Sequence, residues 1–446
     1  MRRCEIDAIV ATSPANVTYC AGFHSWLDPL FKQYMIDPGG SDALPQRFVL
    51  IPAEGRSALV LDPESHTNAA ESWVDDIYLY GDPVPRFEGP SPRDPAQDQQ
   101  YVRAKRQFGT AVACLADAAR RAGIEDGRIG VEMAGLLPER RAQIEAALNK
   151  ARVLDCTNLL RLVRMVKTDE EIRRLEQATQ IGEIAAHDAM AQAAPGRSMQ
   201  EVVQRFRVGV AERGADLDHF AFSIAGHGLA TKPDYRLKEH DVMFVDYGCV
   251  HHHYFSDAGT TLAMRPLNAG AQRIFDVVQR AMTAGAVALA PGVRASAPQA
   301  AMQKVMGEGD LPGQFPHGHG IGLELRDYPI LVPDNGRRIH DGCVNVPSDL
   351  ALEPNMVLNL EVGAFLAGFG SFQNEQTFLI TADGARPLVP QARSEPVVAG
   401  DGASTGGEPR GSNAGSGKEP QMHTHTHRKS AKPMKTTLVH RSHVAR

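Results

Sequence analysis

Short apolar stretches between turn-forming residues mark the first third of the chain. Five of them are rich in strand-forming residues and predict short β-strands. Tyr101–Ala122, which lies between the fourth and the fifth, is predicted as a helix. Strands that alternate with a helix predict an α/β unit that ends near Leu160. The predicted strands are Asp7–Ala11, Arg47–Pro52, Ser57–Leu61, Ile77–Tyr80 and Arg128–Met133.

A second unit opens with a clear helix start. Thr168 to Glu171 (TDEE) matches a capping box, and apolar residues follow at helical spacing at positions 172, 175, 178 and 181. A block of strands comes after the helices. Helices and strands in separate blocks predict an α+β domain built on an antiparallel sheet. The predicted strands are Val242–Tyr247, Thr260–Met264, Val357–Val362 and Thr377–Thr381.

The composition changes beyond about Arg393. Ser394–Arg446 is rich in Gly, Ser and Pro and almost lacks large apolar residues, so it cannot offset the entropy of ordering. We therefore predict a disordered tail. Its HTHTH motif, with His423, His425 and His427, could hold a metal ion loosely, but this composition favours a solvated polar segment.

Length and charge narrow the class of protein. A chain of 446 residues predicts two domains, and a net charge of −6 without a basic stripe in the body argues against nucleic acid as the main partner. The sequence contains no run of about 18 apolar residues, so we expect no membrane-spanning segment. The apolar stretch before Thr12 is too short for a signal peptide. The six cysteines lack CxxC spacing, which indicates reduced, buried thiols in a cytoplasmic protein.

Four carboxylates lie inside or beside apolar strands of the second unit. Asp246 and Asp257 are eleven residues apart, and Glu361 and Glu375 fall on two later strands. Burying these carboxylates without a compensating positive charge would cost free energy. The sequence shows no set of buried Lys or Arg residues that could supply this charge. His319 lies in the glycine-rich stretch FPHGHGIGLELRDYP, whose backbone can approach other groups closely. A pair of divalent cations explains the set best, and these ligands suit Mn, Fe or Co and accept Zn.

The order of these residues resembles the pita-bread metallopeptidases, which include methionine aminopeptidase, Xaa-Pro aminopeptidase and prolidase. The matching pattern is D-x10-D, then GHGIG, then E-x13-E in strand contexts. Three further segments are similar to this family, so the resemblance covers nearly everything except the tail. They are TSPANVTYCAGF at Thr12–Phe23, RMVKTDEEIRRLEQA at Arg164–Ala178 and SDLALEPNMVLNLE at Ser348–Glu361.

The resemblance implies an architecture. The fold class is α+β, with a C-terminal pita-bread (creatinase/aminopeptidase-like) catalytic domain at residues 161–393. A smaller α/β creatinase-like N-terminal domain, residues 1–160, precedes it, and the tail, residues 394–446, follows. Relatives have a helix ahead of the strand that begins here at Asp7, so we expect either a trimmed first domain or a true start farther upstream. Relatives pair, so a homodimer is expected.

The resemblance also implies the roles in the site. Asp246 would chelate one of two divalent ions, for which manganese is the first expectation and cobalt, iron or zinc the alternatives. Asp257 and Glu375 would bridge both ions. His319 and Glu361 would complete the ligand set of the second ion. A bridging hydroxide would attack the scissile amide carbonyl, and Glu361 would pass the proton to the leaving amine. The glycines beside His319 would keep the path of the substrate clear.

Several positions depart from the family pattern. Arg326, in RDYP, stands where relatives often have a substrate-contacting histidine. An arginine cannot relay a proton at ordinary pH, but it could bind the carboxylate of a short peptide. Leu229 stands where many relatives carry another such histidine, and His227 either substitutes for it or is a loop residue without a role. His317 either contacts substrate or supports His319. His251–His253 fill a turn, and we expect them to be exposed.

Three functions follow from this pattern. The leading hypothesis is a dinuclear metallopeptidase of Xaa-Pro dipeptidase or aminopeptidase type that acts on a small peptide or amide. The second is a hydrolase or lyase of the same fold for a non-peptide amide or an amino-acid derivative, as in creatinase; the altered segment at Arg326 motivates it. The third, which the complete ligand set disfavours, is a non-catalytic binding protein on the same scaffold.

Overall fold

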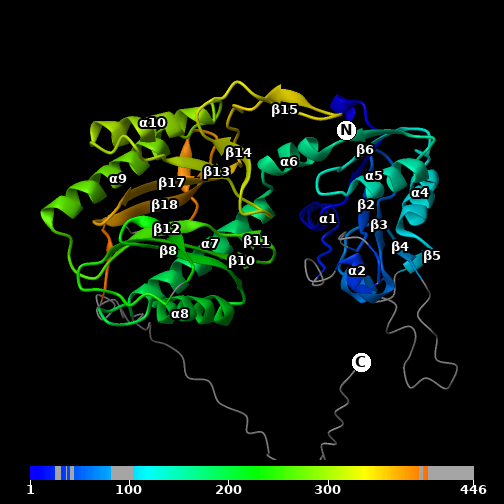
Figure 1. Cartoon of the computed structure of the whole chain (residues 1–446). Coiled ribbons are helices and arrows are strands. Elements are labelled where there is room, and N and C mark those ends of the chain that lie inside the picture. The colour runs from blue at the N-terminus through cyan, green and yellow to red at the C-terminus, as the bar shows by residue number, and fades with distance from the viewer. Residues whose placement is uncertain are drawn as a thin grey trace, which may run out of the picture. The chain divides into compact units, whose positions relative to one another are not determined.

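Two β-sheets organise the chain, and each is built from a separate part of the sequence. The computed structural model describes residues 1–25, 32–36, 38–40, 45–81, 104–232, 234–390 and 395–399. One sheet uses residues between 8 and 155, and the other uses residues between 216 and 398 (Figure 1). The predicted order, a smaller α/β unit before a larger α+β unit, is confirmed. The boundaries at residues 160 and 393 stay predictions.

The smaller sheet is the core of the first unit. Within the described residues its seven strands follow the order β5-β4-β3-β2-β1-β6-β7. They are β1 (Ala8–Ala11), β2 (Phe48–Pro52), β3 (Ala58–Leu61), β4 (Asp76–Tyr80), β5 (Ala104–Phe108), β6 (Arg128–Val131) and β7 (Arg152–Asp155). β2 is antiparallel to β1 and β3, and the other neighbouring pairs are parallel. All five predicted strands are present.

Helices cover both faces of the smaller sheet. Successive side chains of a strand point to opposite faces, so the ALVL sequence of β3 contributes apolar groups to both layers. α4 and α5 pack on one face, and α1 and α6 pack on the other. The helical segments are η1 (Arg2–Cys4), α1 (Pro14–Ala21), α2 (Gln33–Ile36), η2 (Pro63–Ala69), α4 (Ala111–Arg121), α5 (Pro138–Ala147) and α6 (Thr157–Met165).

The helix predicted over Tyr101–Ala122 is wrong in its first half. Ala104–Phe108 forms β5, which pairs in parallel with β4, and α4 begins only at Ala111. The Thr110 side chain accepts a hydrogen bond from the backbone N–H of Ala113 (3.2 Å) and caps the helix. Pairing at the open edge of the sheet therefore overrides local helix propensity, and the capping threonine marks the true helix start.

The larger sheet is antiparallel, as predicted, apart from one short parallel pair. Its main path is β14-β13-β17-β18-β12-β10-β8-β9, and β11, β19 and β20 pair with β10, β18 and β12. The strands are β8 (Asp216–Ile224), β9 (His227–Ala230), β10 (Val242–His251), β11 (Tyr254–Phe255), β12 (Ala258–Ala263), β13 (His317–Gly320), β14 (Asp327–Leu331), β17 (Val357–Leu366), β18 (Gly370–Ile380), β19 (Ala385–Pro387) and β20 (Val397–Val398). A separate pair is formed by β15 (Arg338–His340) and β16 (Asn345–Pro347).

Two helix pairs pack on this sheet. α7 (Asp169–Met190) and α8 (Met199–Glu212) bury apolar side chains against β8 and β10, and α9 (Ala269–Val287) and α10 (Ser296–Glu308) do so around β17 and β18. In Figure 1 the central strands run between the two pairs. The predicted capping box is confirmed, because Thr168 and Glu171 exchange hydrogen bonds at the start of α7. Among the described helices, none is long and apolar enough to cross a membrane.

Two residues of the predicted tail belong to the larger sheet. Val397 and Val398 form β20 and pair with Leu262 and Ala263 of β12. This two-residue apolar stretch is long enough to extend the sheet. The HTHTH motif lies outside the described residues. All six cysteines are free, as predicted, although Cys4, Cys20 and Cys343 are only partly buried.

A buried polar network joins the first unit to the larger sheet. Arg164 on α6 donates from Nη1 to Oδ1 of Asn16 (3.1 Å). Its Nη2 lies 3.2 Å from Oδ2 of Asp327 and also contacts Glu324. Asn16 in turn donates to Oε1 of Glu132 (2.6 Å). A buried guanidinium requires such compensation, so this network fixes α1, α6 and the start of β14 to one another.

We predict that Glu132→Ala lowers the free energy of unfolding by about 3 kcal/mol. Oε2 of Glu132 accepts hydrogen bonds from the backbone N–H groups of Thr12 (2.8 Å) and Ser13 (2.9 Å) at the start of α1, and Oε1 accepts the one from Asn16. Removal of the carboxylate leaves these donors unsatisfied in a buried place. Urea unfolding followed by circular dichroism measures the effect.

Glu125→Ala is the matched control for this variant. Glu125 pairs with Lys150 (3.3 Å) at the surface, so its loss should cost less than about 1 kcal/mol. Equal destabilisation by the two substitutions would contradict the role given to Glu132.

Candidate metal centre

Five residues form a row across the strands of the larger sheet. Asp246 on β10 lies opposite Gly259 on β12, and Gly259 lies opposite Glu375 on β18. Glu375 is opposite Glu361 on β17, which is opposite His317 on β13. Residues in register on neighbouring strands point to the same face of a sheet. The register therefore brings three of the predicted carboxylates to one place, although they are far apart in the sequence.

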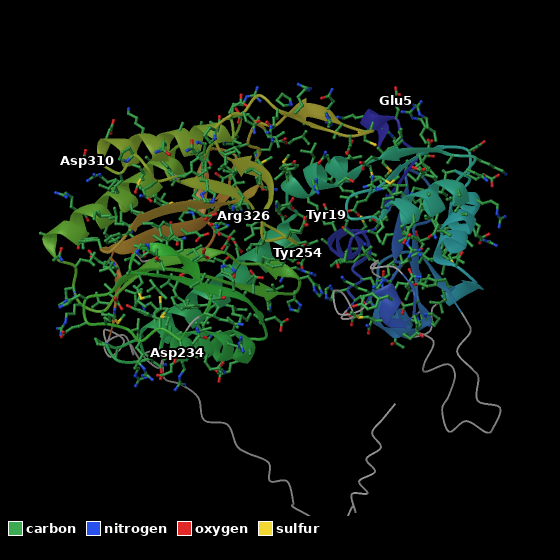
Figure 2. The ribbon with its side chains drawn as sticks, viewed as in Figure 1. Glu5, Tyr19, Asp234, Tyr254, Asp310 and Arg326 are labelled. Atoms are coloured by element: carbon green, nitrogen blue, oxygen red, sulfur yellow. The ribbon has the colours of Figure 1, made fainter. Side chains whose placement is uncertain are left out.

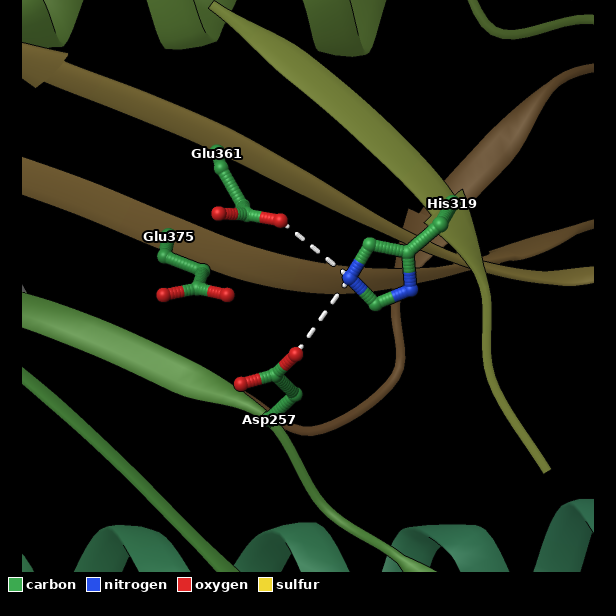
Figure 3. Close-up of side chains that lie close together, drawn as sticks. All are labelled: Asp257, His319, Glu361 and Glu375. Atoms are coloured by element: carbon green, nitrogen blue, oxygen red, sulfur yellow. Dashed lines mark ion pairs between the residues drawn. The ribbon is translucent and has the colours of Figure 1, made fainter. Parts of the chain in front are cut away.

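Four buried side chains form the centre of the site (Figure 3). Asp257, His319, Glu361 and Glu375 each place one polar atom within 4.8 Å of the others. Nε2 of His319 lies 3.3 Å from Oδ2 of Asp257 and 3.2 Å from Oε1 of Glu361. Asp257 itself lies between β11 and β12, where the chain turns back into the sheet. The structure thus brings the predicted residues together from four different segments.

The tautomer of His319 suits a cation. Its Nδ1 lies 2.9 Å from the carbonyl oxygen of Gly320, which can only accept a hydrogen bond, so Nδ1 carries the proton. Nε2 faces the carboxylates of Asp257 and Glu361 and would offer its lone pair to a bound cation. In the described part of the chain this buried atom has no hydrogen-bond partner. An unpartnered nitrogen facing carboxylate oxygens is the arrangement that a divalent metal ion would satisfy.

A second group of possible ligands adjoins the first and shares Asp257. It contains His219, Asp246 and Asp257. Oδ1 of Asp257 lies 3.5 Å from Nε2 of His219, whereas its Oδ2 faces His319. The two oxygens of one carboxylate therefore point towards the two groups. The sequence interpretation missed His219 because it predicted no strand over Asp216–Ile224, and the apolar stretch FAFSI that follows His219 was the available signal.

Burial and mutual repulsion raise the pKa of two carboxyl groups. Glu375 has a pKa well above its ordinary value, chiefly because it is buried and then because Asp257, Asp246 and Glu361 lie nearby. Burial also raises the pKa of Asp246, although its hydrogen bond with His219 opposes the shift. Anions gathered in this way without a cation are unfavourable. This cost is the electrostatic reason to place metal ions here.

Amides orient Glu375 from both sides. Nδ2 of Asn359 donates to Oε1 (2.6 Å), and Nε2 of Gln373 donates to Oε2. Amide donors fix the carboxylate without adding a positive charge that would compete with a metal ion. Neighbours that position a ligand in this way tune metal affinity.

Glu361 has a different environment, in which nitrogen groups crowd one oxygen. Its Oε1 accepts a hydrogen bond from Nη2 of Arg326 (2.8 Å) and lies 3.1 Å from Nε2 of His317. Burial alone would raise the pKa of Glu361, but His317 and His319 hold it well below its ordinary value. Arg326 has a side chain that is 53% exposed, and it lies just before β14 (Figure 2). Glu361 is therefore ionised and is linked to the surface through Arg326.

His227 and His251–His253 lie outside these two groups of possible ligands. His227 is exposed on β9, and no contact between its side chain and either group is found within the described residues. His252 and His253 are exposed, as expected, whereas His251 is partly buried on β10. The ring of His253 stacks on that of His24 in the first unit, with centroids 4.1 Å apart. None of these residues belongs to the two groups of possible metal ligands.

The glycines beside His319 have a structural reason that differs from the predicted one. A Cβ on Gly318 would lie 2.4 Å from the carbonyl oxygen of Asn359, and one on Gly320 would lie 2.2 Å from that of Tyr328. Neighbouring strands β17 and β14 thus leave no room for side chains there. Close strand packing explains these glycines, whereas the sequence interpretation assigned them to the path of the substrate.

Comparisons with known proteins find similar families and similar folds. A family described as metallopeptidase family M24 matches residues 173–382, and the creatinase/prolidase N-terminal domain matches residues 1–166. An Xaa-Pro dipeptidase from Pyrococcus furiosus is 26% identical over 245 residues, which are 53% of this chain and 66% of that protein. The solved prolidase from Pyrococcus horikoshii has a TM-score of 0.65 at 20% identity and covers 88% of this chain and 96% of its own. An X-Pro aminopeptidase from Thermotoga maritima has a TM-score of 0.67 at 19% identity, covering 88% and 98%.

We predict that Gly320→Ala destabilises the protein by about 1–3 kcal/mol, because the added methyl group forces β13 away from β14. Thermal unfolding should show the loss. Gly313→Ala is the matched control, since a Cβ on Gly313 meets nothing within 4 Å, and its effect should stay within about 0.5 kcal/mol. A Gly320 variant as stable as the Gly313 variant would show that the strands can separate without cost.

Proposed function

Since this chain belongs to the pita-bread metallopeptidase family, we propose that it is a dinuclear metal-dependent peptidase of the Xaa-Pro dipeptidase or aminopeptidase type. One observation carries the proposal: the buried carboxylates meet around Asp257, and the unpartnered Nε2 of His319 faces the same point. The Xaa-Pro dipeptidase relative and the prolidase fold support this substrate class. A homodimer and a cytoplasmic location remain predictions.

The residues that would hold the two ions are the five predicted ones. Asp246 and Asp257 would serve one ion, and His319 and Glu361 the other. Asp257 and Glu375 would serve both, which fits the opposite directions of the two Asp257 oxygens. Bound divalent ions would lower the pKa of a water molecule and polarise the substrate carbonyl. Oxygen-rich ligands make manganese the first choice.

Glu361 is the residue that would move a proton. Its Oε1 accepts a hydrogen bond from Arg326 and lies 3.1 Å from Nε2 of His317 and 3.2 Å from Nε2 of His319, whereas no hydrogen bond to Oε2 is formed within the described residues. Because Glu361 is ionised, it can accept a proton and pass it towards the leaving amine. His317 would position this carboxylate through its contact with Oε1.

Arg326 would select the substrate. Only its Nη2 is engaged within the described part of the chain, so the rest of this exposed guanidinium is free to bind a carboxylate. A free C-terminal carboxylate close to the scissile bond occurs in a dipeptide or another short peptide. This feature favours a dipeptidase over an enzyme for long chains.

A second candidate function keeps the site and changes the substrate. Arg326 would also suit the carboxylate of an amino-acid derivative, so the chain could act on a non-peptide amide as a hydrolase or lyase. A non-catalytic binding role has less support because the complete ligand set is present. A substrate panel separates these possibilities.

We predict that a metal chelator abolishes hydrolysis of Xaa-Pro dipeptides and that added Mn²⁺, Co²⁺ or Zn²⁺ restores it. Asp257→Asn should lower kcat/KM by more than about 100-fold, because this carboxylate would serve both ions. A panel of Xaa-Pro dipeptides, longer Xaa-Pro peptides and non-peptide amides measures the activity. Metal-independent turnover, or turnover of the amides alone, would contradict the peptidase assignment.

Asp276→Asn is the matched control for Asp257→Asn. Asp276 is an exposed residue of α9 that contacts only Gln272 within the described residues, so the substitution should leave kcat/KM unchanged. Circular dichroism checks that both variants fold.

We also predict that Arg326→Gln raises KM by roughly 10–100-fold for dipeptides with a free carboxylate, because a charge-assisted hydrogen-bond pair is lost. Dipeptide amides should show little change in KM. Arg273→Gln, on the exposed face of α9, is the control. An equal change for free and amidated substrates would mean that Arg326 acts through Glu361 and not on the substrate.

A further inference from the structure

His219 has no role in the predicted ligand set, yet its ring lies against two members of that set. Nε2 of His219 is 2.7 Å from Oδ1 of Asp246 and 3.5 Å from Oδ1 of Asp257. Its Nδ1 is 2.7 Å from Oδ2 of Asp218, the preceding residue on β8. Both nitrogens of the ring are therefore engaged, one with a residue outside the site and the other with residues inside it.

We propose that His219 is a nitrogen ligand of the metal ion held by Asp246 and Asp257, and that Asp218 orients its ring. The inference rests on the proposed function, because it presupposes that the site binds metal ions. It goes beyond that function by assigning a sixth protein ligand and by changing the chemistry of one of the two metal positions.

The arrangement around His319 is repeated around His219. In each case an acceptor holds Nδ1: the carbonyl oxygen of Gly320 for His319, and the Asp218 carboxylate for His219. In each case Nε2 points towards Asp257 and one other carboxylate. An acceptor on Nδ1 fixes the tautomer that leaves Nε2 free to bind a metal. The two histidines thus approach the opposite oxygens of Asp257 in the same way.

A hydrogen bond accounts for one of the two contacts of Nε2 and not for the other. The distance from Nε2 of His219 to Oδ1 of Asp246 is 2.7 Å, which is a hydrogen-bond length, whereas the distance to Oδ1 of Asp257 is 3.5 Å. A single proton on Nε2 could serve only one of these carboxylates, and 3.5 Å is too long for a hydrogen bond. A cation between the three groups would satisfy all of them.

The backbone beside His219 leaves room for its ring. Gly248 on β10 lies opposite His219 in the sheet register, next to an irregularity between Gly248 and Cys249. A Cβ on Gly248 would lie 2.4 Å from the carbonyl oxygen of Ser256, 2.6 Å from Cε1 of His219 and 2.9 Å from Nδ1 of His219. The Ser256 backbone already requires a glycine at this position. The same glycine leaves the space that the His219 ring occupies beside β10.

A nitrogen ligand changes which metal the position prefers. Carboxylate and water ligands suit manganese, whereas imidazole suits zinc, cobalt and iron. With His219, each of the two ions would have one imidazole, His219 for the first and His319 for the second. We therefore expect the position at Asp246 and Asp257 to favour Zn²⁺ or Co²⁺ over Mn²⁺ more strongly than oxygen ligands alone would.

The test uses the full chain, stripped of metal and titrated separately with Zn²⁺, Co²⁺ and Mn²⁺ by calorimetry and metal analysis. Wild type should bind two ions. His219→Ala should weaken one of them by roughly 100-fold or more, and more for Zn²⁺ and Co²⁺ than for Mn²⁺. Asp218→Asn, which keeps the ring, should weaken the same ion by about 10–100-fold. His187→Ala, on the exposed face of α7, is the matched control and should change nothing.

A spectroscopic readout identifies the ligand directly. With ¹⁵N-labelled histidine and Mn²⁺ in both positions, electron spin-echo measurements should detect two histidine nitrogens in wild type and one in His219→Ala. If His219→Ala binds both ions with wild-type affinity, or both nitrogens persist, the proposal is wrong while the proposed function stands. If wild type binds one ion and His219→Ala binds two, the ring fills the place of a metal ion, and the proposal is also wrong. If wild type binds no ion, the proposed function fails together with this inference.

Discussion

Repulsion among buried carboxylates is the constraint on which the rest of the structure depends. Asp257, Glu361 and Glu375 are buried and lie within reach of one another, and the partly buried Asp246 adjoins them through Asp257. Burial raises the pKa of Glu375 and of Asp246, and the neighbouring carboxylates raise both further. A fold that tolerates this cost must be stabilised elsewhere, and the apolar layers of α7–α8 and α9–α10 on the larger sheet supply that stability.

The register of the larger sheet determines where these carboxylates meet. Because Asp246, Glu375 and Glu361 lie in one row across β10, β18 and β17, a shift of one residue in any strand would turn a carboxylate to the opposite face. Long paired strands and amide contacts such as that from Asn359 resist the shift. The rigidity of the centre is therefore a property of the whole sheet and not of the site residues alone.

The sequence predicted the parts of this arrangement that depend on local pattern. Carboxylates within apolar strands signalled a buried charged cluster, and strand positions followed from composition. What it did not predict depends on pairing between distant segments. The sequence predicts a helix over β5 because its partner strand β4 lies in another part of the sequence. It places Val397–Val398 in the tail because this short segment becomes a strand only by pairing with β12. His219 was missed for the same reason, since only the pairing of β8 with β10 brings it to Asp246.

The carboxylates on the two sides of the site, Glu375 and Glu361, have different neighbours. Around Glu375 the neighbours are neutral amides, which fix a carboxylate and leave its charge to a metal ion. Around Glu361 the neighbours are two imidazoles and Arg326, which keep the carboxylate ionised and connect it to the exposed surface. We therefore assign the proposed proton transfer to Glu361, whose charge is shared with solvated or titratable groups. On the opposite side, towards Asp246 and His219, each group has a fixed acceptor or donor, so that side would hold an ion in place while the proton moves at Glu361.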